Sequence, residues 1–336
     1  MSKDSKSDSL QEDYRNRVAN ETKHFIGPQS FSSLPPMVNW WSEKYLAPRV
    51  LNIFGTRGVD NFYAMPIRVR AERTNVVVLA LSLGSGDGEI ELQIARRLIA
   101  SGVRNFKILG LELSDELVSR ANDSAVKLGL SSLVQFSVGD LNSLQVSQKF
   151  DCVIANQILH HIVDLEHVLS GVKAALKDDG QFLVRDMIGK NGHQAWPEVK
   201  TIVDEIWSAM PKRYKYHHVF KKSFDSFPNL DFSVKSFEGI RSQDILPLLT
   251  EGFGFSRFYA FGGIVERFVS RGFGKNYDPS NIDDRSFVTQ LQLINDIAID
   301  FGAIKPTQMI AYVAKTKVGT CVRWKERTPE FCVRRP

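Results

Sequence analysis

An apolar, β-branched run that begins at Val76 leads into a turn of small residues, among them Gly84, Ser85, Gly86 and Gly88. Behind the turn, apolar residues recur at helical spacing between positions 90 and 99. The pattern predicts a strand, a glycine-rich turn and a helix. Because glycine has no Cβ, such a turn lets the backbone approach a ligand closely, and the helix N-terminus behind it offers unpaired N–H groups. We expect a nucleotide-like ligand at this turn.

Polar residues end the next three predicted strands. Glu112 ends the second strand, where a carboxylate can accept hydrogen bonds from both hydroxyls of a ribose. Asp140 follows the third strand and can accept from an adenine amine, and Asn156 and Gln157 end the fourth. The residues directly after the two carboxylates are expected to line the same ligand site: Leu113 and Leu141.

Alternating strands and helices must position these residues. Strand patterns occur at 76–83, 107–112, 133–138, 150–155 and 181–186, and helical patterns lie between them at 89–101, 114–128 and 164–176. This alternation predicts a parallel sheet with helices on both faces, which binds its ligand outside the carboxyl ends of the strands. Helices at 196–210, 243–250 and 283–301 and strands at 254–261 and 307–315 are expected to follow.

The order of these motifs resembles the class I S-adenosylmethionine-dependent methyltransferases. The matching motifs are the glycine turn, Glu112, the Gly139-Asp140 pair, the 150–156 run and the approach to the fifth strand at 175–183. The resemblance covers roughly residues 76–190 well and the last two strands loosely. It implies an α/β fold with a doubly wound, mostly parallel seven-stranded sheet of the Rossmann-like type. It also implies S-adenosyl-L-methionine as the cofactor.

Two positions in and beside the turn bear on which ligand it binds and how that ligand is held. Glu89 stands where the dinucleotide fingerprint requires a third glycine, which argues against a nicotinamide or flavin dinucleotide. Ser82 stands where the methyltransferase family usually has an acidic residue that helps to hold the cofactor's amino group. Asp87, Glu91 or a bridging water are the alternatives for that role.

Histidines are the candidate catalytic residues. His160 and His161 follow the fourth strand, and His193 lies just past the fifth. With an ordinary pKa near 6.5, a histidine suits the removal of a proton during methyl transfer. The alternative for the pair is a structural or cofactor-lining role. Asp186, at the end of the fifth strand, is a comparable candidate for contact with the substrate.

Composition limits the other function classes. The 43% apolar content suffices for a large core, no apolar run is long enough to span a bilayer, and the N-terminus lacks a secretory signal. Three cysteines without a Cys-x-x-Cys pair indicate neither disulfides nor a zinc cluster, so no metal is expected and a cytoplasmic location fits best. Of the net charge of +5, four units come from the last twenty residues, where six Lys or Arg face two Glu.

We expect five parts in the chain. These are a polar segment with a helical preface (1–72), a cofactor-binding core (73–188), a lid or substrate insertion (189–242), the remainder of the sheet with a helical insertion (243–316), and a basic, frayed tail (317–336). The additions would roof the site, which favours a small or medium-sized acceptor such as a sugar, a lipid head group or a secondary metabolite.

Two alternative functions remain open. The basic 212–222 segment and the tail suit an RNA methyltransferase, which would bind RNA in a salt-dependent manner. Ser82 is the one feature that favours a non-catalytic cofactor-binding module. In the favoured interpretation the partner is a small molecule, nucleic acid and membrane spans are not expected, and the oligomeric state stays open, with a homodimer as one option.

Overall fold

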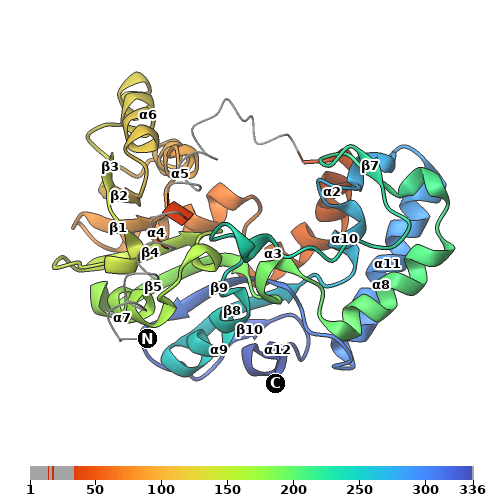
Figure 1. Ribbon diagram of the computed structural model, residues 1–336. Coiled ribbons are helices and arrows are strands. Elements are labelled where there is room, and N and C mark those ends of the chain that lie inside the picture. Colours follow the sequence, from red (N-terminus) through yellow and green to blue (C-terminus); the bar gives the residue numbers. More distant parts are fainter. Residues whose placement is uncertain (1–13, 15–16, 19–33, 335–336) are drawn as a thin grey trace, which may run out of the picture.

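A mostly parallel sheet forms the centre of the computed structural model, which describes Tyr14, Arg17, Val18 and residues 34–334 (Figure 1). Its strand order is β10-β8-β9-β5-β4-β1-β2-β3. The bounds are β1 Val78–Leu83, β2 Phe106–Glu112, β3 Val134–Val138, β4 Phe150–Asn156, β5 Leu176–Met187, β8 Gly254–Phe261, β9 Gln308–Ala314 and β10 Val322–Arg323. Only β9 among these runs antiparallel to its neighbours, β5 and β8. The predicted fold class is confirmed, with β10 as an additional short strand.

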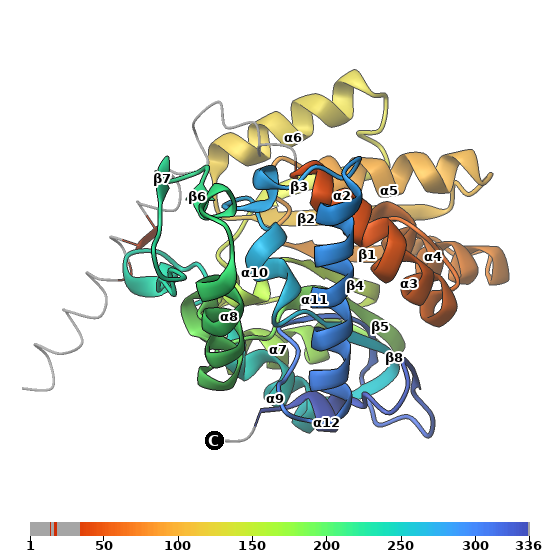
Figure 2. The same ribbon diagram turned by 90° about the vertical axis from the view of Figure 1, so that its right-hand side faces the viewer.

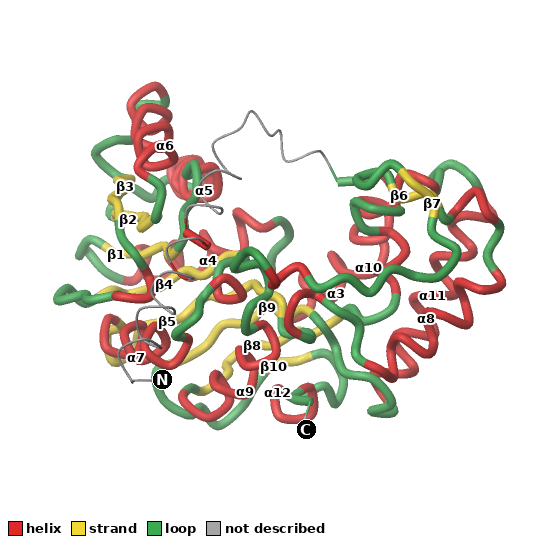
Figure 3. Tube along the Cα trace, viewed as in Figure 1, coloured by secondary structure: helices red, strands yellow, loops and turns green. Residues whose placement is uncertain are grey.

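Helices cover both faces of the sheet, as Figure 3 shows. One face packs against α4 (Val59–Arg73), α5 (Glu89–Ala100) and α6 (Asp115–Lys127). The other packs against α7 (Leu165–Ala175) and α9 (Ser242–Gly252), with α12 (Pro329–Cys332) beside β8. Successive strand residues point to opposite faces of the sheet, and both faces are covered. Every residue of β4 from 150 to 155 is therefore buried. The near-continuous apolar run in the sequence follows from this double cover.

A second group of helices lies beside the sheet (Figures 1 and 2). It contains α2 (Pro36–Trp41), a π-helical turn at Ser42–Leu46, α3 (Ala47–Phe54), α8 (Pro197–Ala209), α10 (Val265–Val269), α11 (Ile282–Asp300) and the hairpin of β6 (Tyr216–His217) and β7 (Lys222–Ser223). Trp41 Nε1 donates a hydrogen bond of 2.6 Å to Gln292 Oε1 and so ties α2 to α11. Segments far apart in the sequence thereby build one lobe.

The structure tests the expectation for the C-terminal end of the chain but not the one for the N-terminal end. The expectation of a frayed C-terminal tail is wrong for residues 317–334, because β10 pairs with β8 and α12 packs on the sheet. Arg327 is 1% exposed and forms ion pairs of 2.8 Å with Asp296 and 2.7 Å with Asp300. The expected loose stretch at 1–30 lies outside the described residues, apart from Tyr14, Arg17 and Val18.

Within the described ranges, 14, 17–18 and 34–334, no helix is both long enough and apolar enough to span a membrane.

Candidate functional site

The turn between β1 and α5 has the backbone that its glycines predict. Gly84, Gly86 and Gly88 adopt φ values of +62°, +56° and +78°. A Cβ at Gly84 would lie 2.3 Å from the Ile158 side chain, so packing requires glycine there. A Cβ at Gly86 would meet no heavy atom of the described chain within 4 Å. The backbone at Gly86 therefore borders open space that a ligand can enter.

Glu112 lies directly beside this turn, because β1 and β2 are neighbours in the sheet. Its Oε2 accepts a hydrogen bond of 3.0 Å from Gly86 N, and its Oε1 accepts one of 3.1 Å from Ser114 N. Each carboxylate oxygen has a second lone pair and can accept from a ligand hydroxyl as well. Leu113 follows and is partly buried. The structure thus brings the predicted ribose carboxylate to the predicted turn.

Asp140, one strand further along, contacts the N-terminal segment. Its Oδ2 accepts a hydrogen bond of 2.8 Å from the Tyr14 hydroxyl, and its Oδ1 accepts one of 2.9 Å from Asn142 N. Burial and the Asp140 carboxylate raise the pKa of Tyr14 to about 12, so the phenol stays a donor. Arg17 donates to the carbonyls of Ser233 and Ser236. No pattern in the sequence predicts that Tyr14 or Arg17 would lie near this site.

Asp140 is followed by Leu141, which is buried and begins a short 3₁₀ helix.

Ser82 and Glu91 form a buried pair beside the turn. Ser82 Oγ donates a hydrogen bond of 2.6 Å to Glu91 Oε1. Glu91 is 2% exposed, and its Oε2 has no hydrogen-bond partner among the described residues. Burial, with weaker contributions from the nearby Asp87 and Glu112 carboxylates, raises the pKa of Glu91 to about 7. Of the two acidic alternatives for the Ser82 position, Glu91 is the one in contact with it.

The end of β4 is held from two sides. Asn156 Oδ1 accepts hydrogen bonds from the Tyr63 hydroxyl at 3.1 Å and from Arg185 Nη1 at 3.4 Å. Gln157 has a φ of +55°, which is uncommon for a residue with a side chain, and its N–H donates to the Arg185 carbonyl at 2.8 Å. The strained residue therefore sits where the chain leaves the sheet beside the glycine turn.

The three candidate histidines meet around one carboxylate, Glu238. His193 Nε2 and His160 Nε2 lie 2.6 Å and 3.6 Å from Glu238 Oε1, and His161 Nε2 lies 3.4 Å from Oε2. The rings of His160 and His161 have centroids 4.3 Å apart. The sequence predicted the three histidines as candidates, but it missed Glu238, which belongs to an irregular stretch with no periodic pattern.

Asp186, near the end of β5, holds the histidine cluster through His160. It is fully buried, and its Oδ1 lies 2.6 Å from His160 Nδ1. Its Oδ2 accepts from the backbone N–H groups of Ile158 and Leu159 at 2.9 Å and 2.8 Å. Burial works to lower the pKa of His160, but the carboxylates of Asp186 and Glu238 outweigh it and raise that pKa to about 10.

The paired histidines keep the pKa of Glu238 well below its usual range in spite of burial. At neutral pH His160 is therefore a cation between two carboxylates and not a free base.

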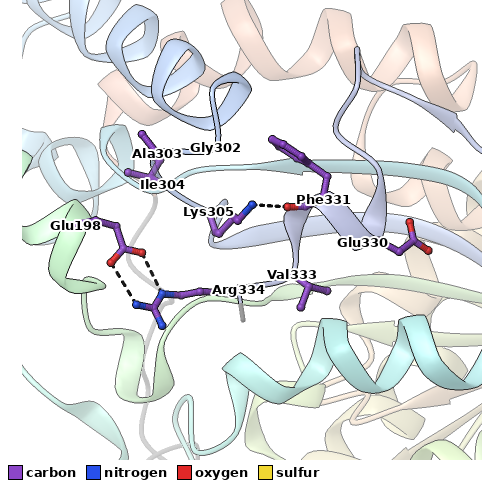
Figure 4. Close-up of a pocket in the computed structure, with 9 residues that line it drawn as sticks. All are labelled: Glu198, Gly302, Ala303, Ile304, Lys305, Glu330, Phe331, Val333 and Arg334. Carbon is purple, nitrogen blue, oxygen red and sulfur yellow. Dashed lines mark hydrogen bonds and ion pairs between the residues drawn. The ribbon is translucent and has the colours of Figure 1, made fainter. Parts of the chain in front are cut away.

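A hollow of about 420 Å³ lies elsewhere, between the start of α8, the loop before β9 and α12 (Figure 4). The two basic side chains that line it contact other lining residues. Arg334 pairs with Glu198 at 3.0 Å, and Lys305 Nζ donates to the Phe331 carbonyl at 2.6 Å. None of the predicted site residues, all of which the structure describes, lines this hollow. We place the candidate functional site at the strand ends because the reactive groups gather there.

Comparisons with known proteins identify the family of the chain. Residues 77–244, half of the chain, match the family model described as "Methyltransferase domain". The curated 27-O-demethylrifamycin SV methyltransferase of Amycolatopsis mediterranei (strain S699) is 32% identical over 82 residues, 24% of this chain. The matched part spans 30% of that relative's length.

Solved structures with a similar course of the chain include the [4+2]-cyclase SpnF, at 18% identity and a TM-score of 0.41, covering 76% of this chain and 82% of that one. Another is the O-methyltransferase from a trans-AT PKS multienzyme of Brevibacillus brevis in complex with S-adenosyl-L-homocysteine, at 13% identity and a TM-score of 0.42, covering 85% and 81%. The match of half the chain to the family model decides the assignment: the protein belongs to the methyltransferase-domain family, and its resemblance to the class I S-adenosylmethionine-dependent methyltransferases is confirmed.

Proposed function

We propose that the protein transfers the methyl group of S-adenosyl-L-methionine to a small or medium-sized acceptor by in-line displacement. The observation that carries the proposal is the turn at 84–88, which binds Glu112 through Gly86 N and has the unpartnered Glu91 oxygen beside it. The acceptor classes we favour are a sugar, a lipid head group or a secondary metabolite. The name of the curated relative, whose substrate is a rifamycin, supports the last of these.

The residues present fit this cofactor. Two buried polar atoms near the turn, Glu91 Oε2 and Ser85 Oγ, lack partners in the described part of the chain. A buried carboxylate needs a cation or a donor, and the cofactor's ammonium group is one. We assign Glu91 to that group, Glu112 to the ribose hydroxyls and Asp140 to the adenine amine. The turn from Gly84 to Gly88, with Leu113, Leu141, Asn156 and Gln157, would complete the lining.

When bound, the cofactor supplies a methyl group that its sulfonium already makes electrophilic. The chain's own residues then have to hold the acceptor in line and take its proton. Orientation of this kind can contribute up to roughly 7–11 kcal/mol. We assign the proton to the imidazole of His161, which Glu238 orients through Nε2, because His160 is locked between Asp186 and Glu238. His193 is the second candidate through the same carboxylate.

We place the enzyme in the cytoplasm, where its three unpaired cysteines, Cys152, Cys321 and Cys332, would stay reduced.

Replacing Glu112 by alanine tests the cofactor site. We expect the affinity for S-adenosylmethionine to fall roughly 10- to 100-fold, since hydrogen bonds to a charged group contribute about 1.5–3 kcal/mol. Isothermal titration calorimetry measures the change, with Glu116→Ala, a partly exposed residue in the first turn of α6, as the control. Binding as tight as that of the parent would show that the site is assigned wrongly.

Replacing His161 by alanine tests the proposed base. With tritiated S-adenosylmethionine and extract fractions as the source of acceptor, we expect the rate of label transfer to fall roughly 10²-fold, the lower end of what a positioned base contributes. Cofactor affinity should stay at the parent's level, which separates the loss of the base from damage to the cofactor site. An unchanged rate for this variant would remove His161 from the mechanism.

A further inference from the structure

We propose that His160, His193 and Glu238 bind a divalent transition-metal ion, at a site that no pattern in the sequence predicts. One ligand atom from each residue can be chosen so that all three lie within 4.8 Å of one another. Glu238 Oε1 is the shared oxygen, 3.6 Å from His160 Nε2 and 2.6 Å from His193 Nε2. Ligand atoms around a tetrahedral ion with bonds of about 2.0–2.1 Å lie about 3.3 Å apart. The observed distances bracket that spacing.

The surroundings of His160 are those of a metal-binding histidine. A histidine that ligates a metal through one nitrogen donates the other N–H to a carboxylate or carbonyl, which fixes the ring and its tautomer. His160 Nδ1 lies 2.6 Å from Asp186 Oδ1, which leaves Nε2 as the atom that faces Glu238. An incoming ion takes the place of the proton on Nε2, so metal binding releases that proton to the solvent. Asp186 is in turn oriented by three backbone N–H groups, those of Ile158, Leu159 and Met187.

Backbone contacts hold the three ligand segments together before any ion is bound. Ile240 N donates to the His160 carbonyl at 3.0 Å, and Gly192 N donates to the Gly239 carbonyl at 2.9 Å. These two bonds tie the 236–240 stretch to the ends of both β4 and β5.

His193 itself has a φ of +57°, an uncommon conformation for a residue with a side chain. Its carbonyl accepts a hydrogen bond of 2.6 Å from Arg267 Nη1, which helps to hold the peptide in that conformation. Strain that neighbouring contacts maintain in this way is typical of functional sites.

The donor set indicates which ion would bind. Two imidazoles and one carboxylate suit zinc and its first-row neighbours, and they leave positions open for water or another oxygen ligand. Glu238 is 40% exposed at its side chain, against 4% for His160, so the open side of the site faces away from the sheet. His161 lies on the other oxygen of Glu238, Oε2. An ion at this place would lie within reach of an acceptor oxygen next to the proposed base.

The site can be tested without any assumption about methyl transfer. The full chain, free of a polyhistidine tag and treated with a chelator, is titrated with Co²⁺ in the absence of S-adenosylmethionine. We expect one Co²⁺ per chain, visible d–d absorption bands of a four- or five-coordinate ion, and displacement of those bands by Zn²⁺. Because the cofactor is absent, failure of the proposed function would leave this result unchanged.

Matched variants decide whether these residues are the ligands. Glu238→Gln keeps the size of a partly exposed side chain, and His193→Ala removes an imidazole; we expect both to lose the one-to-one Co²⁺ bands. His167→Ala on the exposed surface of α7 should bind like the parent. Circular dichroism and thermal unfolding check that each variant folds. A parent chain that takes up no stoichiometric Co²⁺, or a folded Glu238→Gln that still shows the bands, would overturn the proposal.

Discussion

Replacing Asp186 by alanine is expected to lower the free energy of unfolding by about 3–5 kcal/mol, the usual result when one partner of a buried ion pair is removed. The Asp186 carboxylate is fully buried and lies 2.6 Å from His160 Nδ1. It also accepts from the backbone N–H groups of Ile158, Leu159 and Met187. Alanine would leave these N–H groups without an acceptor, and the buried His160 cation would keep only Glu238, at 3.6 Å, as a partner. The histidine cluster should lose its order together with the stability.

The pH dependence of unfolding provides a second signature of the same pair. The pKa of His160 is about 10 in the folded chain, above its ordinary 6.5, so the pair stabilises the fold fully below pH 6.5. The stabilisation is lost as the pH rises through 10. Asp186→Ala should make this slope smaller and leave only the part that Glu238 contributes.

Urea unfolding at several pH values measures both effects. Asp178→Ala is the matched control on the same strand, because Asp178 is fully exposed and pairs with Lys315 at the surface. We expect that control to unfold like the parent, because an exposed ion pair contributes little to stability. A similarly small loss for Asp186→Ala would show that the cluster does not depend on this carboxylate.

The core of the fold and the cofactor residues could be predicted from the sequence because local patterns encode them. The strand, turn and helix around Gly84 each have their own signal in apolar spacing and glycine placement, and Glu112 and Asp140 sit at fixed distances from strand ends. In a parallel sheet these ends must meet at one edge. The register β1–β2 then places Glu112 beside the turn with no further information.

The rest depends on contacts that no local pattern contains. Glu238 comes from an irregular stretch and reaches the histidines only because Ile240 and Gly239 bond to the segments after β4 and β5. Tyr14 meets Asp140 across 126 positions of sequence. The C-terminal residues lie against the fold instead of fraying because the buried Arg327 pairs with two partly buried carboxylates of α11, Asp296 and Asp300. In each case the partner lies in a segment whose local sequence pattern does not indicate the contact.

Replacing Glu91 by glutamine is expected to stabilise the cofactor-free protein at neutral and alkaline pH. The pKa of Glu91 is about 7 in the folded chain, above the 4.5 of an ordinary glutamate, because the side chain is buried. The folded state therefore binds more protons than the unfolded state between these values, and the parent loses stability as the pH rises from 4.5 to 7. The loss amounts to about 3 kcal/mol at 1.36 kcal/mol per pKa unit. The variant, which cannot ionise, should not show it.

Thermal unfolding of both proteins at pH 4.5 and pH 8 measures the difference, and Glu89→Gln, an exposed residue of the same helix turn, is the control that should follow the parent. Equal pH slopes for Glu91→Gln and the parent would mean that folding does not raise the pKa of Glu91.

The same substitution should weaken S-adenosylmethionine binding. A gain in stability together with a loss of cofactor affinity would identify Glu91 as a functional residue. If its unpartnered Oε2 receives the cofactor's ammonium group, glutamine loses a charge-assisted hydrogen bond of about 1.5–3 kcal/mol. Binding of a cation beside Glu91 also favours the ionised carboxylate, so the parent should release a proton on binding below pH 7. Calorimetry at pH 6 in buffers of different ionisation enthalpy detects that proton. The contrary outcome is a variant that is more stable than the parent and binds the cofactor as tightly, with no proton release from either protein. Glu91 would then be a structural residue, and another group would have to replace the acidic residue that the family has at the position of Ser82.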